Sequence, residues 1–161
     1  MDSTEEVLEA FRKIPWFQEL KEEHIRKLAS ISRLRPMKAG EIIFREGDTH
    51  ESVYIVVDGR VGLEMFVPHQ GKVRFYTAEP SEIFGWSSVT PNVHVRTAGA
   101  TAVLDGMLIR IDAEKLNQAC DEDHDLGYLV MRRLARVVAG RLQVTRLQLL
   151  DMFANPEFKN A

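Results

Sequence analysis

The stretch Glu82-Ile-Phe-Gly-Trp-Ser-Ser-Val-Thr-Pro-Asn-Val-His-Val-Arg-Thr-Ala-Gly-Ala100 is the part of the chain around which the rest is arranged. It brings a glycine and two hydroxyl residues, Gly85, Ser87 and Ser88, close in sequence to Arg96. A glycine followed by serines at the start of a short helical turn can present N–H groups and hydroxyls to an anion. Arg96 would supply the opposite charge, because its planar fork suits phosphate.

A purely structural interpretation of the same stretch stays open. Gly85 and Pro91-Asn92 would then only shape an irregular loop, Ser87 would cap a turn, and Arg96 would pair with a surface carboxylate. Taken alone, the stretch favours this structural interpretation. The remainder of the chain therefore has to decide between the two.

Composition limits the class of protein. The 161 residues are 45% hydrophobic and 28% charged, which is typical of one globular domain with a real core. The net charge of −3 offers no basic field for nucleic acid. The acidic N-terminus predicts no secretory signal, and the longest apolar run, 53–57, is too short to span a membrane. The single cysteine, Cys120, rules out an internal disulfide and fits a cytoplasmic location.

Helical patterns occupy both ends of the chain. A Ser-x-x-Glu box at residues 3–6 and apolar residues at helical spacing indicate a helix that ends at Pro15. A second helix follows, and Pro36 is predicted to end the helical part. Near the C-terminus, a short helix is predicted at 112–120 and a long one at 126–153.

Strand patterns fill the middle of the chain, from residue 41 to residue 111. Three turn signals divide them, at Asp58-Gly59, at 68–71 and at Asp105-Gly106, and each predicts a hairpin. Short strands at such spacing indicate an antiparallel sandwich or barrel. Helices before and after the strands make the predicted fold class α+β.

Several motifs together resemble the cyclic-nucleotide-binding domain family, which includes catabolite-activator-type transcription regulators and regulatory subunits of cyclic-nucleotide-dependent kinases. The motifs are the Phe44–Asp48 turn, the run 54–61, Phe84-Gly85, the closing helix, and a glycine framework of Gly40, Gly47, Gly59 and Gly85. The resemblance implies one domain over 1–161, with a jelly-roll barrel of about eight strands. N-terminal helices would occupy about 1–36, the barrel 37–111 with a phosphate-binding cassette at 82–100, and C-terminal helices 112–153.

The resemblance also implies a ligand site, residue by residue. Family members that bind cyclic nucleotides hold the ribose 2′-hydroxyl with a Glu, and that position is Trp86 here. The family's cassette arginine and its small neighbour match Arg96-Thr97, and Thr145 lies in the segment that reaches the base in transcription regulators. The implied ligand-binding residues are Gly85, Trp86, Ser87, Ser88, Arg96, Thr97 and Thr145. Trp86 favours an anion with a flat or apolar body, with a cyclic nucleotide second.

Catalytic and DNA-binding functions are not predicted. The five histidines are scattered without the His-x-His pair of metal-dependent cupins, and no catalytic triad or phosphate-binding P-loop occurs. Family members that regulate transcription continue into a helix-turn-helix, whereas this sequence stops at Ala161. We therefore expect no sequence-specific DNA binding by this chain alone. The arginines of the long helix fit a solvated face.

The sequence predicts a stand-alone regulatory or sensor module that binds a small anionic effector and signals through its C-terminal helix, with a possible protein partner. The effector would be a cyclic nucleotide or another ligand bearing phosphate or carboxylate, and no cofactor, metal or membrane is expected. The apolar residues of the long helix exceed what one barrel can cover, which predicts a parallel homodimer with Leu134 and Val137 in its interface. Two alternatives stay open: a degenerate interaction domain whose pocket Trp86 fills, and the effector subunit of a transcription regulator.

Overall fold

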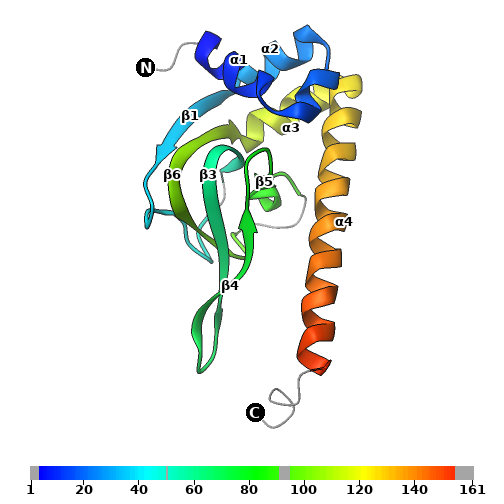
Figure 1. Ribbon diagram of the computed structural model, residues 1–161. Helices are drawn as coiled ribbons and strands as arrows, with labels where there is room; N and C mark the ends of the chain where they lie inside the picture. Colours follow the sequence, from blue (N-terminus) through cyan, green and yellow to red (C-terminus); the bar gives the residue numbers. More distant parts are fainter. Residues whose placement is uncertain (1–3, 50, 91–94, 155–161) are drawn as a thin grey trace.

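The computed structural model describes residues 4–49, 51–90 and 95–154, and within them a curved antiparallel sheet carries helices at one end and a long helix along one side (Figure 1). The sheet consists of β1 (Ser32–Met37), β2 (Ile42–Phe44), β3 (Ser52–Val67), β4 (Gly71–Ala78), β5 (Ile83–Phe84) and β6 (Gly99–Asp112). The helical elements are α1 (Thr4–Arg12), η1 (Pro15–Glu19), α2 (Glu22–Ser30), η2 (Trp86–Val89), α3 (Ala113–Glu122) and α4 (His124–Ala154). The α+β jelly-roll prediction is confirmed.

The long strands β3 and β6 form the centre of the sheet. The strand order is β1-β6-β3-β4, with β2 on β6 and β5 on β3. In β3, Val53 and Ile55 pack into a core shared with the helices, whereas Tyr54 and Val56 pack into a second core among the strands. Both faces of this segment are therefore buried, which explains why its apolar run is continuous rather than alternating.

The two hairpins predicted at Asp-Gly pairs are wrong. Asp58-Gly59 lies inside β3 and Asp105-Gly106 lies inside β6, at a place where the register between the two strands shifts. A Cβ added at Gly106 would lie 2.0 Å from the carbonyl oxygen of Asp58, and Gly59 has a φ of 90°. The glycines thus permit two strands to approach and bend together, as at a β-bulge. Because each strand runs through the bend, the described residues contain six strands rather than eight.

The hairpin predicted at 68–71 is confirmed, because β3 ends at Val67 and pairs antiparallel with β4, which begins at Gly71. The predicted helical part, in contrast, ends earlier than expected. Helix α2 ends at Ser30, and Pro36 lies in β1 instead of terminating a helix. Among the described residues β1 pairs only with β6. As an edge strand it tolerates a proline, which has no N–H to donate.

Both predicted C-terminal helices are confirmed, and α4 reaches Ala154. Only its first part packs into the core of its own chain, where Leu126, Val130 and Leu134 are buried. Leu134 and the half-buried Val137 therefore contact the chain's own core, so their predicted place in a dimer interface is wrong. In the part of the chain that the structure describes, no helix has the length and apolar character needed to cross a bilayer.

A second stripe of α4 is exposed and has coiled-coil spacing. The positions follow one another at alternating intervals of four and three, which is the spacing of a coiled-coil seam. They are Met131, Ala135, Val138, Leu142, Thr145, Leu149 and Met152. We call this stripe the outer seam. It contains Thr145, which was predicted to lie beside a ligand, and all seven of its positions are exposed.

Asp123 joins the start of α4 to α2. Its Oδ1 accepts hydrogen bonds from the N–H groups of Asp125 and Leu126, and its Oδ2 lies 3.1 Å from Nε2 of the buried His24. The Leu126 N–H bond, followed by the charge and hydrogen bond of His24, lowers the pKa of Asp123. A carboxylate with a lowered pKa stabilises the folded state above its unfolded pKa of about 3.9.

We therefore expect Asp123→Ala to lower the melting temperature at neutral pH, because the cap and the His24 contact are lost. The difference from the wild type should shrink as the pH falls below about 4 and Asp123 is protonated in the folded state too. Melting curves between about pH 6 and pH 3 measure this, with the exposed Asp121→Ala as control. A difference that stays constant over this range would contradict the assignment.

Candidate functional site

The cassette begins with a glycine that the backbone requires. Gly85 follows β5 and has a left-handed conformation, with a φ of 73°, before the short η2 helix. A Cβ at this position would lie 2.8 Å from Nη1 of Arg96. Any side chain would thus strain the backbone and collide with the arginine. Gly85 brings the carbonyl at the start of η2 against the guanidinium.

Arg96 is buried, with an exposed fraction of 4%. Its Nη1 donates to the carbonyl of Gly85 at 2.8 Å, and its Nη2 donates to the carbonyl of Ser52 at 2.5 Å. The guanidinium carbon lies 4.0 Å from the centre of the Phe44 ring. These contacts hold the fork in one plane on an aromatic face.

The charge of Arg96 is not matched by a carboxylate. Among the described residues it forms no ion pair, and its Nε has no hydrogen-bond partner. Burial lowers the pKa of Arg96, because a cation is removed from water, while Tyr54 and, from beyond ion-pair distance, Asp48 oppose this shift. The structural interpretation in which Arg96 pairs with a surface carboxylate is therefore wrong for the described residues. This arrangement makes Arg96 a candidate for binding an anion.

Five of the predicted site residues meet at one small pocket. Gly85, Trp86, Ser87, Arg96 and Thr97 line a hollow of about 60 Å³, together with side chains of the barrel. Such a volume admits a few water molecules or a small anion. Trp86 is half-buried and packs against the helical core. A ligand of nucleotide size requires Trp86 or its neighbours to move.

The two other predicted residues lie elsewhere. The Ser88 hydroxyl faces the carbonyls of Gly85 and Ser52, at 2.9 and 3.0 Å, which are the same two acceptors that Arg96 uses. The Ser88 hydroxyl thus helps to hold in place the two carbonyls that bind Arg96, and it does not line the pocket. Thr145 is exposed on α4 and donates to the carbonyl of Arg141. Their roles as ligand contacts stay predictions. Residues 91–94, including the Pro91-Asn92 turn, lie outside the described residues.

Sequence reasoning missed two residues that hold Arg96. Phe44 supplies the aromatic face on which the guanidinium lies. The carbonyl of Ser52 accepts a hydrogen bond from Arg96, and the Ser52 hydroxyl accepts one from Nε of Arg110 at 2.8 Å. Phe44 is the first residue of the Phe44–Asp48 turn, which is one of the family motifs in the sequence. Its contact with Arg96 could therefore have been predicted from that motif. The role of Ser52 depends on its main chain, and no residue type signals that.

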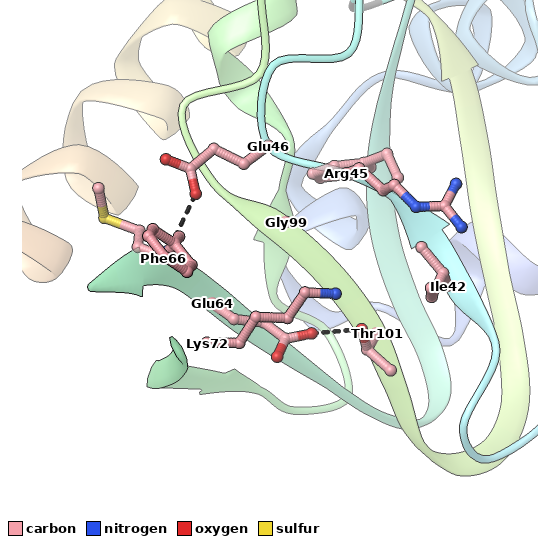
Figure 2. A pocket seen from close by; sticks show the side chains of 10 residues that line it. Ile42, Arg45, Glu46, Glu64, Phe66, Lys72, Gly99 and Thr101 are labelled. Atoms are coloured by element: carbon pink, nitrogen blue, oxygen red, sulfur yellow. Dashed lines mark hydrogen bonds between the residues drawn. The ribbon is translucent and has the colours of Figure 1, made fainter. Parts of the chain in front are cut away.

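Phe44 also lines a larger hollow, of about 350 Å³. Figure 2 shows this hollow from close by. Its charged residues are balanced, with Arg45 and Lys72 against Glu46 and Glu64. Figure 2 shows the two carboxylates already bonded, Glu46 to the N–H of Phe66 and Glu64 to the hydroxyl of Thr101. The size of a hollow alone therefore does not identify a candidate anion site. The smaller cassette pocket has the unmatched charge.

A metal centre finds no support within the described ranges 4–49, 51–90 and 95–154, where no group of three His, Cys, Asp or Glu side chains could hold an ion. The one cysteine, Cys120, is a buried free thiol, and burial raises its pKa. A raised pKa keeps the thiol protonated and unreactive. Neither feature adds redox or metal chemistry to the site.

Comparison with known proteins assigns the chain to one family. The family model of the cyclic nucleotide-binding domain matches residues 34–123, which is more than half of the chain. The chain belongs to the cyclic nucleotide-binding domain family. The crystal structure of a cyclic nucleotide-binding domain from Methylobacillus flagellatus superposes with a TM-score of 0.76 over 92% of this chain and 83% of that one, and its 23% identity shows the shared fold.

Two curated relatives are informative. An uncharacterized NTE family protein of Mycobacterium tuberculosis is 28% identical over 129 residues, which is 80% of this chain and 21% of the relative. A CRP-like cAMP-activated global transcriptional regulator of the same organism is 26% identical over 113 residues, 70% of this chain and 48% of the regulator. The chain thus spans about a fifth and about half of the lengths of these two relatives.

Proposed function

We propose that this protein is a regulatory sensor module that binds a small anionic effector at its cassette and transmits the signal through α4. The observation that carries the proposal is the buried guanidinium of Arg96, which has no carboxylate partner among the described residues. Membership of the family supports a ligand-binding rather than a catalytic role. We also propose a cytoplasmic location.

The geometry around Arg96 suits an anion. The Gly85 and Ser52 carbonyls use one N–H of each terminal nitrogen, so further donors of the fork stay available. The aromatic ring of Phe44 fixes the plane of the guanidinium. An anion in the pocket would gain charge-assisted hydrogen bonds and remove the cost of an unmatched buried charge.

Trp86 bears on the choice of effector. A tryptophan offers no acceptor for a ribose hydroxyl, and its flat apolar surface suits a ligand with a flat or apolar body. We therefore propose a phosphate- or carboxylate-bearing ligand of that kind, with a cyclic nucleotide as the second candidate. The regulator among the relatives is described as cAMP-activated, which keeps cyclic nucleotides in the test.

A thermal-shift panel tests the proposal. It should contain cyclic nucleotides, other nucleotides, phosphorylated metabolites and aromatic carboxylates. A ligand present at about a hundred times its dissociation constant adds about 2.7 kcal/mol of stability, or about 5 to 10 °C for a domain of this size. One strong stabiliser is the expected result, and a panel without any would favour the second candidate function.

Arg96→Ala should weaken binding of that stabiliser about ten- to hundredfold, because a charge-assisted pair of about 1.5–3 kcal/mol is lost. Arg96→Lys should recover only part of the affinity, since an ammonium cannot reproduce the fork. Calorimetric titration measures both, and Arg45→Ala, in the larger hollow, is the matched control. Unchanged affinity in Arg96→Ala, or an equal loss in Arg45→Ala, would remove the cassette from the proposal.

The second candidate function is an interaction domain whose pocket is closed. Trp86 is half-buried beside a hollow of only about 60 Å³, which favours this alternative. Such a domain would act through protein contacts alone.

With either function, we propose that the outer seam of α4 pairs with the outer seam of a second copy of the chain, because its seven exposed positions keep coiled-coil spacing.

A further inference from the structure

A third hollow lies between α4 and the barrel and shares no residue with the two described above. Its volume is about 300 Å³. Tyr76, Glu82 and Ile83 line it on the barrel side, and Arg133, Arg136 and Arg141 line it on the helix side. It lies where α4 runs past β4 and β5 (Figure 1). We call it the α4 hollow.

One arginine and the one carboxylate of the α4 hollow are already engaged. The Glu82 carboxylate accepts a hydrogen bond from the Tyr76 hydroxyl and lies 3.5 Å from Nη2 of Arg141. Arg141 also donates to the carbonyl of Ile83 at 2.8 Å and stacks 3.8 Å from the centre of the Tyr76 ring. These groups neutralise one another and fix α4 on the barrel.

Arg133 and Arg136 are left without a counter-charge. Within the described residues neither forms an ion pair, and the Nε of Arg133 is buried with no hydrogen-bond partner. The Arg133 guanidinium lies 5.1 Å from the Trp16 ring, whose own N–H is buried and unpaired. Burial and the neighbouring Arg136 both lower the pKa of Arg133, while Glu19 opposes this from beyond ion-pair distance. Two cations thus face one opening and repel each other.

We propose that the α4 hollow is a second anion site, which binds a phosphate group between the forks of Arg133 and Arg136. Two guanidinium groups match an oxyanion with two charges better than a single carboxylate. Gly140 keeps the hollow open on the helix side, because no heavy atom lies within 4 Å of the place where its Cβ would be. The bound phosphate would neutralise two cations of α4, while Glu82, the carboxylate on the barrel side, stays paired with Arg141.

Titration with inorganic phosphate, followed by ¹H–¹⁵N NMR against chloride of equal ionic strength, tests the site directly. The Nε–H signal of Arg133 and the indole N–H signal of Trp16 should shift and saturate. Pyrophosphate should bind more tightly than phosphate, because it reaches both forks with more charge. A sugar phosphate in a parallel titration distinguishes free phosphate from an esterified phosphate group as the natural ligand.

Arg136→Gln should weaken phosphate binding about tenfold, and since Arg136 is exposed, its fold should be preserved. Arg146→Gln, on an exposed part of the same helix outside the hollow, is the matched control and should bind as the wild type does. Arg96→Ala should leave the shifts of Arg133 and Trp16 intact, which separates this site from the cassette. Equal weakening in Arg136→Gln and Arg146→Gln, or loss of the shifts in Arg96→Ala, would overturn the proposal.

Discussion

Gly106→Ala should destabilise the protein by about 4 kcal/mol or more, which corresponds to a fall in melting temperature of about 8 to 16 °C. The added Cβ would lie 2.0 Å from the carbonyl oxygen of Asp58 and 2.8 Å from the Cα of Gly59. Both are main-chain atoms of β3, so no side-chain rotation relieves the overlap. The two longest strands would have to separate at the bend that they share.

Gly140→Ala is the matched control for this result, because it makes the same chemical change in open space on α4. A glycine in a helix interior is less favourable than alanine by about 1 kcal/mol, so this variant should melt at the same or a slightly higher temperature. Circular dichroism measures both. Similar melting temperatures for the two variants would show that the approach of β3 and β6 does not limit stability.

Leu142→Asp combined with Leu149→Asp should convert a dimer into a monomer. Both leucines are about half exposed, at 49% and 51%, and both lie on the outer seam. Pairing of two copies would bury four leucines, and each contributes about 1.5–3 kcal/mol when fully buried. Placing like charges there instead should raise the dimer dissociation constant roughly a thousandfold or more.

Sedimentation at micromolar concentration measures this change, with Gln143→Asp as control. Gln143 is exposed beside the outer seam but not on it, so its variant should stay dimeric. Leu134 and Val137 are unsuitable for this experiment because they pack into the chain's own core, and charges there would unfold the protein. A wild-type chain that sediments as a monomer would refute the pairing.

Local patterns predicted the elements whose partners lie nearby in sequence. The helical spacing of α4 and the turn at 68–71 depend on neighbouring residues, and both are present. Asp58-Gly59 and Asp105-Gly106 have the composition of hairpin turns, yet each serves the approach of a strand far away in sequence. A turn signal of this kind does not tell whether the chain reverses or a second strand comes close.

The same limit applies to the candidate site. Gly85 and Arg96 could be predicted because their residue types carry the chemistry, a left-handed backbone and a charged fork. The acceptors at Gly85 and Ser52 are main-chain carbonyls, which no residue type encodes, so the bonds that Arg96 and the Ser88 hydroxyl make to them could not be predicted. The sequence also could not predict that Arg96 forms no ion pair among the described residues, since this depends on which carboxylates lie near it in the fold.

The acceptors that hold Arg96 are both carbonyls of the main chain. A side-chain acceptor disappears when its residue mutates, but a carbonyl belongs to every residue type. Replacing Ser52 by another small residue should therefore keep the hydrogen bond from Arg96 to the carbonyl at position 52, although Arg110 would lose its hydroxyl partner. The position of the guanidinium therefore depends on the path of the backbone more than on which side chain stands at position 52.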